Sequence, residues 1–348
     1  MNKILILIIL IFSAAFSQEK AAKKEKVKFG GKADIGIDFK AVGGLDGNTV
    51  NDSRLKRTGV VETEFKILPA DSVQLEFDLE FDHRFADKSL KKLFIRYNFD
   101  NSNARLGFMK KMFTLEEIKS SKDRLFSKKS MIHDVLDEFC LLERDFTLQY
   151  RYNFPYYTLI GGYSADGSNS HFGNLTLLSK KIHNMRFAAA GMYQNYQEWT
   201  VEWERKNAFF GNLGMTYDGK ITDFEIEGVF GTNIQKRVIL REDYTLEYSD
   251  NSGIGFWGLR FQESFPIEMK RKHLNKIIPF YEISYLNTST DLQKAYYQIR
   301  PAVNLCFTPK NRLQWRTNVD LILTANNQES KRPQIISERV ITQFVVMW

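Results

Sequence analysis

The sequence predicts an all-β fold, a transmembrane antiparallel β-barrel of about 16 strands, with about 18 as the alternative. Three observations predict it: an N-terminal segment of the kind that directs export, a long series of segments in which apolar and polar residues alternate, and a final alternating segment that ends on an aromatic residue. The rest of the chain has no second long apolar run. In a membrane it would therefore form a closed barrel, because only helices and edge-free sheets satisfy every backbone polar group in lipid.

The N-terminus has the three parts of a secretory signal peptide. Lys3 is followed by the apolar residues 4–12 and then by small residues that end at Ser17. This run is too short to span a bilayer as a helix, which takes about 20 residues, so an N-terminal anchor helix is the weaker alternative. We expect a cleaved signal peptide over residues 1–17, a short polar tail over 18–26 and the barrel over 27–348.

The alternation is clearest from Val73 to Asp82. The odd-numbered residues are Val, Leu or Phe, and the even-numbered ones are Gln, Glu or Asp. Because successive strand side chains point to opposite faces, one face is apolar and the other is mainly anionic. The pattern recurs, with turn residues between the segments, in the ranges 32–39, 61–67, 93–99, 146–154, 224–230, 297–307 and 312–323. An apolar face outside and a polar face inside are what a water-filled barrel requires.

Composition narrows the possible functions. Aromatic residues make up 14% of the chain although the mean hydropathy is −0.36, which suits a barrel with aromatic girdles and a polar interior. The net charge is +7, but the basic residues are spread along the chain, so we expect no nucleic-acid partner. The histidines lack metal-ligand spacing, and we expect neither a metal nor a cofactor. Cys140 and Cys306 are far apart in sequence and either pair or stay unpaired.

The C-terminal segment supports the same fold independently. Val340, Thr342, Phe344 and Val346 alternate with other residues up to Trp348. A last strand that ends on Phe or Trp resembles the signal by which bacterial barrels enter the outer membrane. We therefore expect the barrel-assembly machinery as a partner, and the lipid of a Gram-negative outer membrane as the surroundings.

One long segment, residues 112–142, breaks the alternation. Thr114 and Glu117 have the spacing of a capping box, with Thr114 as the N-cap of a short helix. Apolar residues such as Phe113 and Leu136 suggest an ordered segment, and long loops in compact domains are usually functional or disordered. We expect this segment to fold into the barrel and narrow it as a constriction loop.

Residues 105–122 read R-L-G-F-M-K-K-M-F-T-L-E-E-I-K-S-S-K, and Arg54-Leu-Lys-Arg lies upstream. These stretches resemble R-V-G-Q-F-K-E-P-F-S-L-E-E-L-T-S-S-R and R-x-R-R of the phosphate-selective porin O and P family. The close match covers about residues 54–131. It implies a barrel of 16 strands, usually trimeric, with an inward loop and an arginine-rich path for anions.

The sequence thus predicts an outer-membrane porin, a water-filled channel for small anionic or polar solutes that prefers phosphate-like anions. Arginine suits such a path because its planar fork holds phosphate through two hydrogen bonds. Alternatively, the lumen cations only pair with inward acids, or the barrel is a non-conducting structural or surface-binding protein. A barrel enzyme is less favoured, because no nucleophile signature is present. The candidate lumen cations are Arg54, Lys56, Arg57, Arg96, Arg105, Lys110, Lys122, Arg124 and Lys129.

Overall fold

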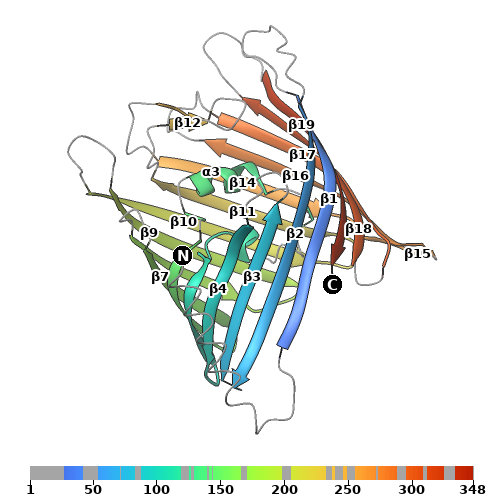
Figure 1. The fold of residues 1–348 in the computed structure, drawn as a ribbon. Helices are drawn as coiled ribbons and strands as arrows, with labels where there is room; N and C mark the ends of the chain where they lie inside the picture. Colours follow the sequence, from blue (N-terminus) through green and yellow to red (C-terminus); the bar gives the residue numbers. More distant parts are fainter. Residues whose placement is uncertain are drawn as a thin grey trace.

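The computed structural model describes residues 27–41, 54–70, 72–82, 88–118, 125–126, 129–138, 141–142, 144–165, 171–197, 205–232, 237–239, 246–248, 255–271, 273–287, 295–308, 312–324 and 334–347. Strands dominate these residues (Figure 1). In chain order the elements are β1 (Val27–Ala41), β2 (Arg54–Ala70), β3 (Val73–Asp82), β4 (Lys88–Asn98), β5 (Ser102–Lys110), α2 (Leu115–Ile118), α3 (Met131–Glu138), β6 (Arg144–Asn153), β7 (Tyr157–Ala165), β8 (His171–Ser179), β9 (Met185–Gln197), β10 (Arg205–Asp218), β11 (Asp223–Thr232), β12 (Arg237–Ile239), β13 (Leu246–Tyr248), β14 (Gly255–Ser264), β15 (Ile267–Arg271), β16 (Leu274–Asn287), β17 (Ala295–Cys306), β18 (Leu313–Thr324) and β19 (Gln334–Met347).

The strands close into one barrel. Apart from β12 and β13, which form a separate two-stranded sheet, the strands pair antiparallel in chain order, with β11 beside β14, and the first strand, β1, pairs with both β2 and the last strand, β19. β14 and β15 both pair with β16 and act as one strand interrupted at Phe265 and Pro266, where proline lacks a donor for the ladder. The ring therefore has 16 strands, which confirms the predicted fold.

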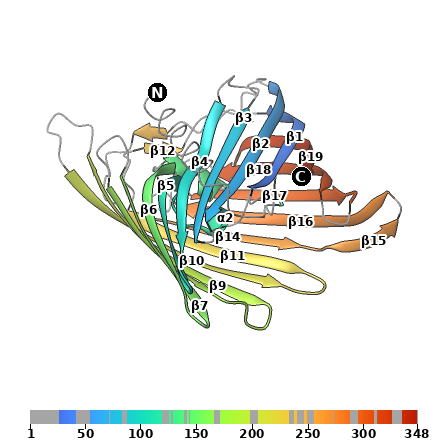
Figure 2. The ribbon, with the colours of Figure 1, turned by 60° about the horizontal axis from the view of Figure 1, so that its bottom comes forward.

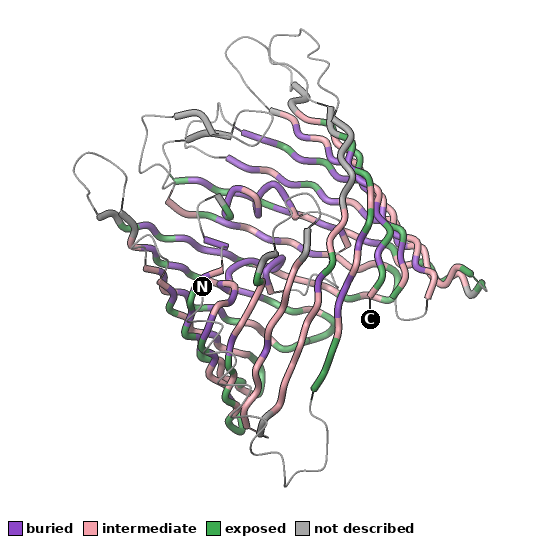
Figure 3. The backbone as a smooth tube through the Cα atoms, viewed as in Figure 1, coloured by how far each residue is buried: buried purple, intermediate pink, exposed green. Residues whose placement is uncertain are grey.

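The two faces of the strands differ as the alternation predicted. In β1, Asp38 is 2% exposed on the inner face, whereas Ile35 is 72% exposed on the outer face. β19 follows the same rule, with Val340, Phe344 and Val346 outside. Figure 3 shows buried and exposed residues alternating along many strands. The barrel thus presents apolar side chains outward and mostly polar ones inward.

The connections at one end of the barrel are short. Between β8 and β9, His183 and Asn184 have φ values of 47° and 67°. The flanking residues Ile182 and Met185 exchange backbone hydrogen bonds of 2.9 and 2.8 Å. This is the two-residue type I′ hairpin, which demands positive φ at both central positions and matches the twist of the strands.

The segment between β5 and β6 turns into the barrel. Figures 1 and 2 show α2 and α3 within the ring of strands. This confirms the predicted inward loop and its short helix, and the structure adds a second helix, α3. None of the helices among the described residues is long and apolar enough to span a membrane.

Candidate pore and constriction loop

The described parts of the constriction loop, residues 112–142, lie against the inner wall from β8 to β18, which is half of the ring. Its backbone is held by wall side chains of β8, β11 and β17. The hydrogen bonds are Thr176 Oγ1 to the Met112 carbonyl (2.5 Å), Leu115 N to Glu227 Oε1 (2.6 Å), Met131 N to Gln298 Oε1 (2.8 Å) and Asn304 Nδ2 to the Leu125 carbonyl (3.0 Å). Wall side chains thus satisfy loop backbone groups that would otherwise be buried without partners.

The loop also packs on the wall through apolar side chains. The cluster consists of Phe113, Met131, Ile132, Val135, Leu136, Leu141 and Leu142 from the loop, with Phe172, Met192, Ala208, Phe210, Val229, Phe256, Leu286, Tyr296 and Ile322 from the wall. Burying one such side chain is worth about 1.5–3 kcal/mol. The lumen therefore contains an apolar core on this side, which fixes the loop in place.

Two wall glycines make room for the loop. A Cβ on Gly214 would lie 2.7 Å from Leu115 Cδ1, and one on Gly258 would lie 3.1 Å from Ile132 Cδ1. Glycine at these positions allows the helices to approach the strand backbone closely.

A buried charge network joins α2 to the wall at β11, β14 and β16. Glu116 accepts hydrogen bonds from the Ser130 hydroxyl (2.7 Å) and backbone, and lies 3.8 Å from Arg260. Burial raises the pKa of Glu116, but the charge of Arg260 and the hydrogen bond from Ser130 outweigh it and lower the pKa to about 2. Arg260 also contacts three wall carboxylates, which are Glu227 (3.0 Å), Glu225 (3.3 Å) and Glu282 (3.3 Å).

A second network surrounds Glu117. Its carboxylate lies 2.5 Å from Lys110 Nζ and 2.7 Å from Lys129 Nζ, and also contacts His133. Burial raises the pKa of Glu117, but His133 and Lys110 outweigh it and hold the pKa well below its usual range. The Thr114 hydroxyl accepts a hydrogen bond from Glu117 N at 3.3 Å, as expected for an N-cap. Lys110 and Lys129, both predicted to line the anion path, thus bind a loop carboxylate.

The inner wall from β1 to β4 carries paired charges. A β-bulge between Leu90 and Lys92 adds one residue to β4, so Lys91 and Lys92 both face the lumen. Lys91 Nζ lies 2.6 Å from Glu62, and Lys92 Nζ lies 2.6 Å from Glu64. This part of the wall is the ladder of paired charges that the sequence offered as an alternative to an anion site.

Three arginines gather on β4, β5 and β6. Arg96 and Arg105 are direct partners across the β4–β5 ladder, and Arg151 on β6 is the partner of Asn103 beside them. Arg96 lies 2.8 Å from Glu76. Like charges directly opposite each other are normally destabilising. Within the described ranges, Glu76 is the one carboxylate within ion-pair distance of this arginine cluster, defined as Arg96, Arg105 and Arg151.

The arginine cluster is held against a ring and an amide. The Arg105 guanidinium lies 5.6 Å from the Phe94 ring centre and that of Arg96 lies 5.9 Å from it, on the ring face that attracts cations. Arg105 Nε donates to Asn103 Oδ1 at 3.1 Å. Neither partner neutralises a charge, so the cluster keeps an excess of positive charge that suits an anion.

The remaining predicted site residues are placed in part or not at all. Arg54, Lys56 and Arg57 belong to β2, where their backbones pair with β1, and their side chains lie outside the described part. Lys122 and Arg124 lie outside the described residues altogether.

Sequence reasoning missed the charges that hold the loop. Arg260 and Arg300 are 2% and 0% exposed, and Arg300 lies 3.0 Å from Glu282. Both arginines stand between outward apolar residues at strand spacing, which marks an inward position. Arg151 could have been found in the same way, because it is two positions from the inward Gln149.

The cysteines and the potential metal ligands complete the account of the predicted chemistry. Cys306 is a buried free thiol, and Cys140 lies outside the described residues. Within the part of the chain that the structure describes, no group of three or more His, Cys, Asp or Glu residues could hold a metal ion.

No family model and no curated protein sequence matches the chain. Solved structures do match. OmpT, an outer membrane protein of Vibrio cholerae in its trimer form, has a TM-score of 0.61 at 12% identity, over 92% of this chain and 99% of that one. The anion-selective porin from Comamonas acidovorans has a TM-score of 0.62 at 11% identity, over 93% and 100%. The channel DcaP of Acinetobacter baumannii has a TM-score of 0.59 at 12% identity, over 94% and 99%. The chain therefore has the porin fold, a closed antiparallel barrel of 16 strands.

Proposed function

We propose that the protein is an outer-membrane porin that lets small solutes diffuse through a water-filled lumen. The observation that carries the proposal is the division of the inner wall. The constriction loop is packed on the strands from β8 to β18, while the wall from β19 round to β6 keeps charged side chains inside. A polar passage between a fixed loop and a charged wall is how channels set width and selectivity.

The finer proposal is a preference for anions of the phosphate type, in line with the resemblance to the phosphate-selective porin O and P family. Its support is the arginine cluster, in which, among the described residues, only Arg96 lies within ion-pair distance of a carboxylate, that of Glu76. A guanidinium fork can hold a phosphate or carboxylate through two hydrogen bonds. The anion-selective porin of Comamonas acidovorans shares the fold.

Reconstitution into planar bilayers tests both parts. We expect discrete conductance steps, and in a salt gradient a reversal potential that favours the anion, with phosphate lowering chloride current. The double variant Arg105→Gln/Arg151→Gln should shift the reversal potential toward cation preference. Arg312→Gln is the matched control, because Arg312 is exposed at the turn between β17 and β18. A cation-favouring potential in the unaltered protein would remove the anion preference.

A non-conducting barrel is the second candidate, favoured by the apolar core that the loop forms inside the lumen. Absence of conductance steps from correctly folded protein would support it over the porin.

The proposal also covers export and assembly of the protein. A cleaved signal peptide directs export, and the barrel-assembly machinery inserts the chain through the strand that ends at Trp348. The barrel is surrounded by outer-membrane lipid and forms a homotrimer. The trimer form of Vibrio cholerae OmpT, which shares the fold, supports the last of these.

A further inference from the structure

A hollow lies inside the barrel between α2 and the turn that joins β8 to β9. Leu115 and Ile118 of α2 line one side of it, and residues of the turn line another. Leu178 lines the strand wall between them and is two positions from Thr176, whose hydroxyl contacts the constriction loop in the lumen. Because residues two positions apart on a strand share a face, Leu178 also faces inward. The hollow is therefore part of the lumen, at the end of the barrel with the short turns.

The part of the hollow next to α2 is apolar. Leu115 is buried there, and Ala188 on β9 is the register partner of Leu178. The small side chain of Ala188 leaves space beside these two leucines. The volume of the hollow is about 350 Å³, within the range of about 300–1,000 Å³ that small-molecule sites occupy. A short hydrocarbon chain suits such a surface.

The other part of the hollow is basic, because Lys180, Lys181 and Arg186 line it. Between the regular pair at Leu178 and the closing pair at Ile182, the hairpin has one more residue on the β8 side than on the β9 side. Such a bulge re-aims side chains, which explains how two consecutive lysines both reach the hollow.

The positive charge at this end is only partly neutralised. Lys181 Nζ lies 3.1 Å from Asp218, and both of these side chains are exposed. In the described ranges of the chain, no carboxylate lies within ion-pair distance of Lys180 or Arg186. The inward acid of the next strand, Glu225, belongs to the buried charge network of α2. Two cations beside an apolar surface match an anion that carries a hydrocarbon group.

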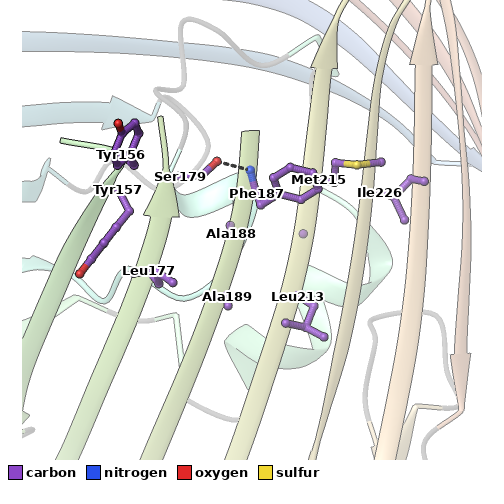
Figure 4. Close-up of a pocket in the computed structure, with 11 residues that line it drawn as sticks. Tyr156, Tyr157, Leu177, Ser179, Phe187, Ala188, Ala189, Leu213, Met215 and Ile226 are labelled. Atoms are coloured by element: carbon purple, nitrogen blue, oxygen red, sulfur yellow. Dashed lines mark hydrogen bonds between the residues drawn. The ribbon is translucent and has the colours of Figure 1, made fainter. Parts of the chain in front are cut away.

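Hydrogen bonds fix the hairpin that carries these cations. Lys180 N donates to the Tyr156 carbonyl at 2.7 Å, which ties the hairpin to the turn before β7. Phe187 N donates to Ser179 Oγ at 2.7 Å, the bond drawn as a dashed line in Figure 4. A site whose backbone is already ordered loses less entropy when it binds a ligand.

We propose that this hollow, the Leu115–Leu178–Arg186 hollow, binds an aliphatic carboxylate. The carboxylate lies against Arg186 and Lys180, and the chain lies between Leu178 and α2. A guanidinium group can hold a carboxylate through two hydrogen bonds. The arginine cluster lies on β4 to β6 and lines no part of this hollow, so the two sites are separate. The inference goes beyond the proposed function and does not depend on conduction.

Ligand-observed NMR of the full chain in detergent tests the site, with hexanoate, acetate and 1-hexanol as probes and empty micelles as the blank. Hexanoate should bind more tightly than the other two, because acetate lacks the chain and 1-hexanol lacks the charge. Arg186→Gln should weaken hexanoate binding about tenfold, as expected for the loss of a hydrogen bond to a charged group, and should leave 1-hexanol binding unchanged. Lys220→Gln is the control for charge, because Lys220 is exposed at the turn between β10 and β11 and does not line the hollow.

Ala188→Leu tests the apolar part, because the larger side chain occupies the hollow and should weaken the binding of hexanoate and 1-hexanol. Ala189→Leu is its control, since Ala189 is the next residue and lies between Leu177 and Leu213 on the outer face (Figure 4). Acetate binding as tight as hexanoate binding would overturn the proposal. So would unchanged hexanoate binding in Arg186→Gln, or equal effects of the two leucine variants.

Conductance recorded on the same samples separates this inference from the proposed function. A barrel that conducts anions but binds hexanoate no better than acetate would contradict this inference alone. A barrel that never conducts but binds hexanoate through Arg186 would contradict the porin alone.

Discussion

Charged residues in the lumen fall into two groups with different surroundings. Glu116 and Arg260 are buried in the contact between loop and wall, where each has several partners of opposite charge or hydrogen-bonding type. Arg105 instead lies beside other arginines and an aromatic ring. The first group holds the loop, whereas the second is the anion site that we propose.

Glu116→Gln should loosen the loop without opening the barrel. Arg260 would keep three other carboxylates, so the loss is confined to the hydrogen bonds from Ser130 and one charge contact. We expect a cost of about 1–3 kcal/mol, and faster protease cleavage in the loop, measured by limited proteolysis in detergent. Glu268→Gln is the control, because Glu268 is exposed on β15 beside Lys276. Equal cleavage rates in the two variants would show that Glu116 does not hold the loop.

Low pH should weaken the attachment of the constriction loop through Glu116. The pKa of Glu116 in the folded protein, about 2, is below its usual value of 4.5. Ionised Glu116 therefore contributes fully to stability above pH 4.5, and this contribution is lost as the pH falls from 4.5 through about 2. Open-channel current noise, recorded over this range, should increase toward acid. Glu116→Gln should show a flatter pH dependence, and an identical pH dependence in both proteins would contradict the assignment.

At the scale of elements, the close fit of helix to strand fixes the position of the loop. Gly258→Val places a side chain where Ile132 now packs 3.1 Å from the Cβ position, so α3 should be displaced from the wall. Valine suits a strand, so we expect the barrel to form and the conductance to change. Gly173→Val is the matched control, because nothing lies within 4 Å of its Cβ position. The same conductance in both variants would mean that α3 does not shape the pore.

The sequence predicted the start of the loop but not where it docks. Thr114 and Glu117 mark the N-cap through a local rule, and the structure contains that hydrogen bond. Docking depends on non-local partners such as Phe210 and Phe256, which break the alternation by placing apolar residues on both faces of a strand. The doublets Phe209-Phe210 and Phe256-Trp257 are the signal that could have located the apolar core.

At the scale of the whole molecule, alternation predicts the class of fold but leaves the strand count open. β12 and β13 form a separate small sheet, and β15 continues β14, so these three segments add no strand to the ring. This resolves the choice between 16 and 18 strands. The strand register could not be predicted from the sequence either, because the bulge at Lys91 changes which residues face the lumen from that point on.

The seam between β1 and β19 decides whether the ring is closed, and a cross-link can test it. Ile37 and Thr342 are register partners there and share the outer face. Because Cα atoms of paired residues lie about 4.5–5.5 Å apart, cysteines at both positions should form a disulfide. Val346 pairs instead with Ala33, four positions along β1, or about 13 Å from Ile37. Cysteines at 37 and 346 should therefore stay reduced.

Both pairs would be made in a Cys140→Ser/Cys306→Ala background, to exclude the native thiols. Mobility of the unheated protein on gels, with and without reductant, reports the cross-link. Without reductant, only the protein with cysteines at 37 and 342 should keep the mobility of the folded barrel, because its disulfide joins the first and last strands of the ring. A cross-link at 37 and 346 instead would mean a shifted seam. That shift would move every inward residue of β19 relative to β1, and with it the pairing of Arg339 with Asp38 that now joins the two strands inside the lumen.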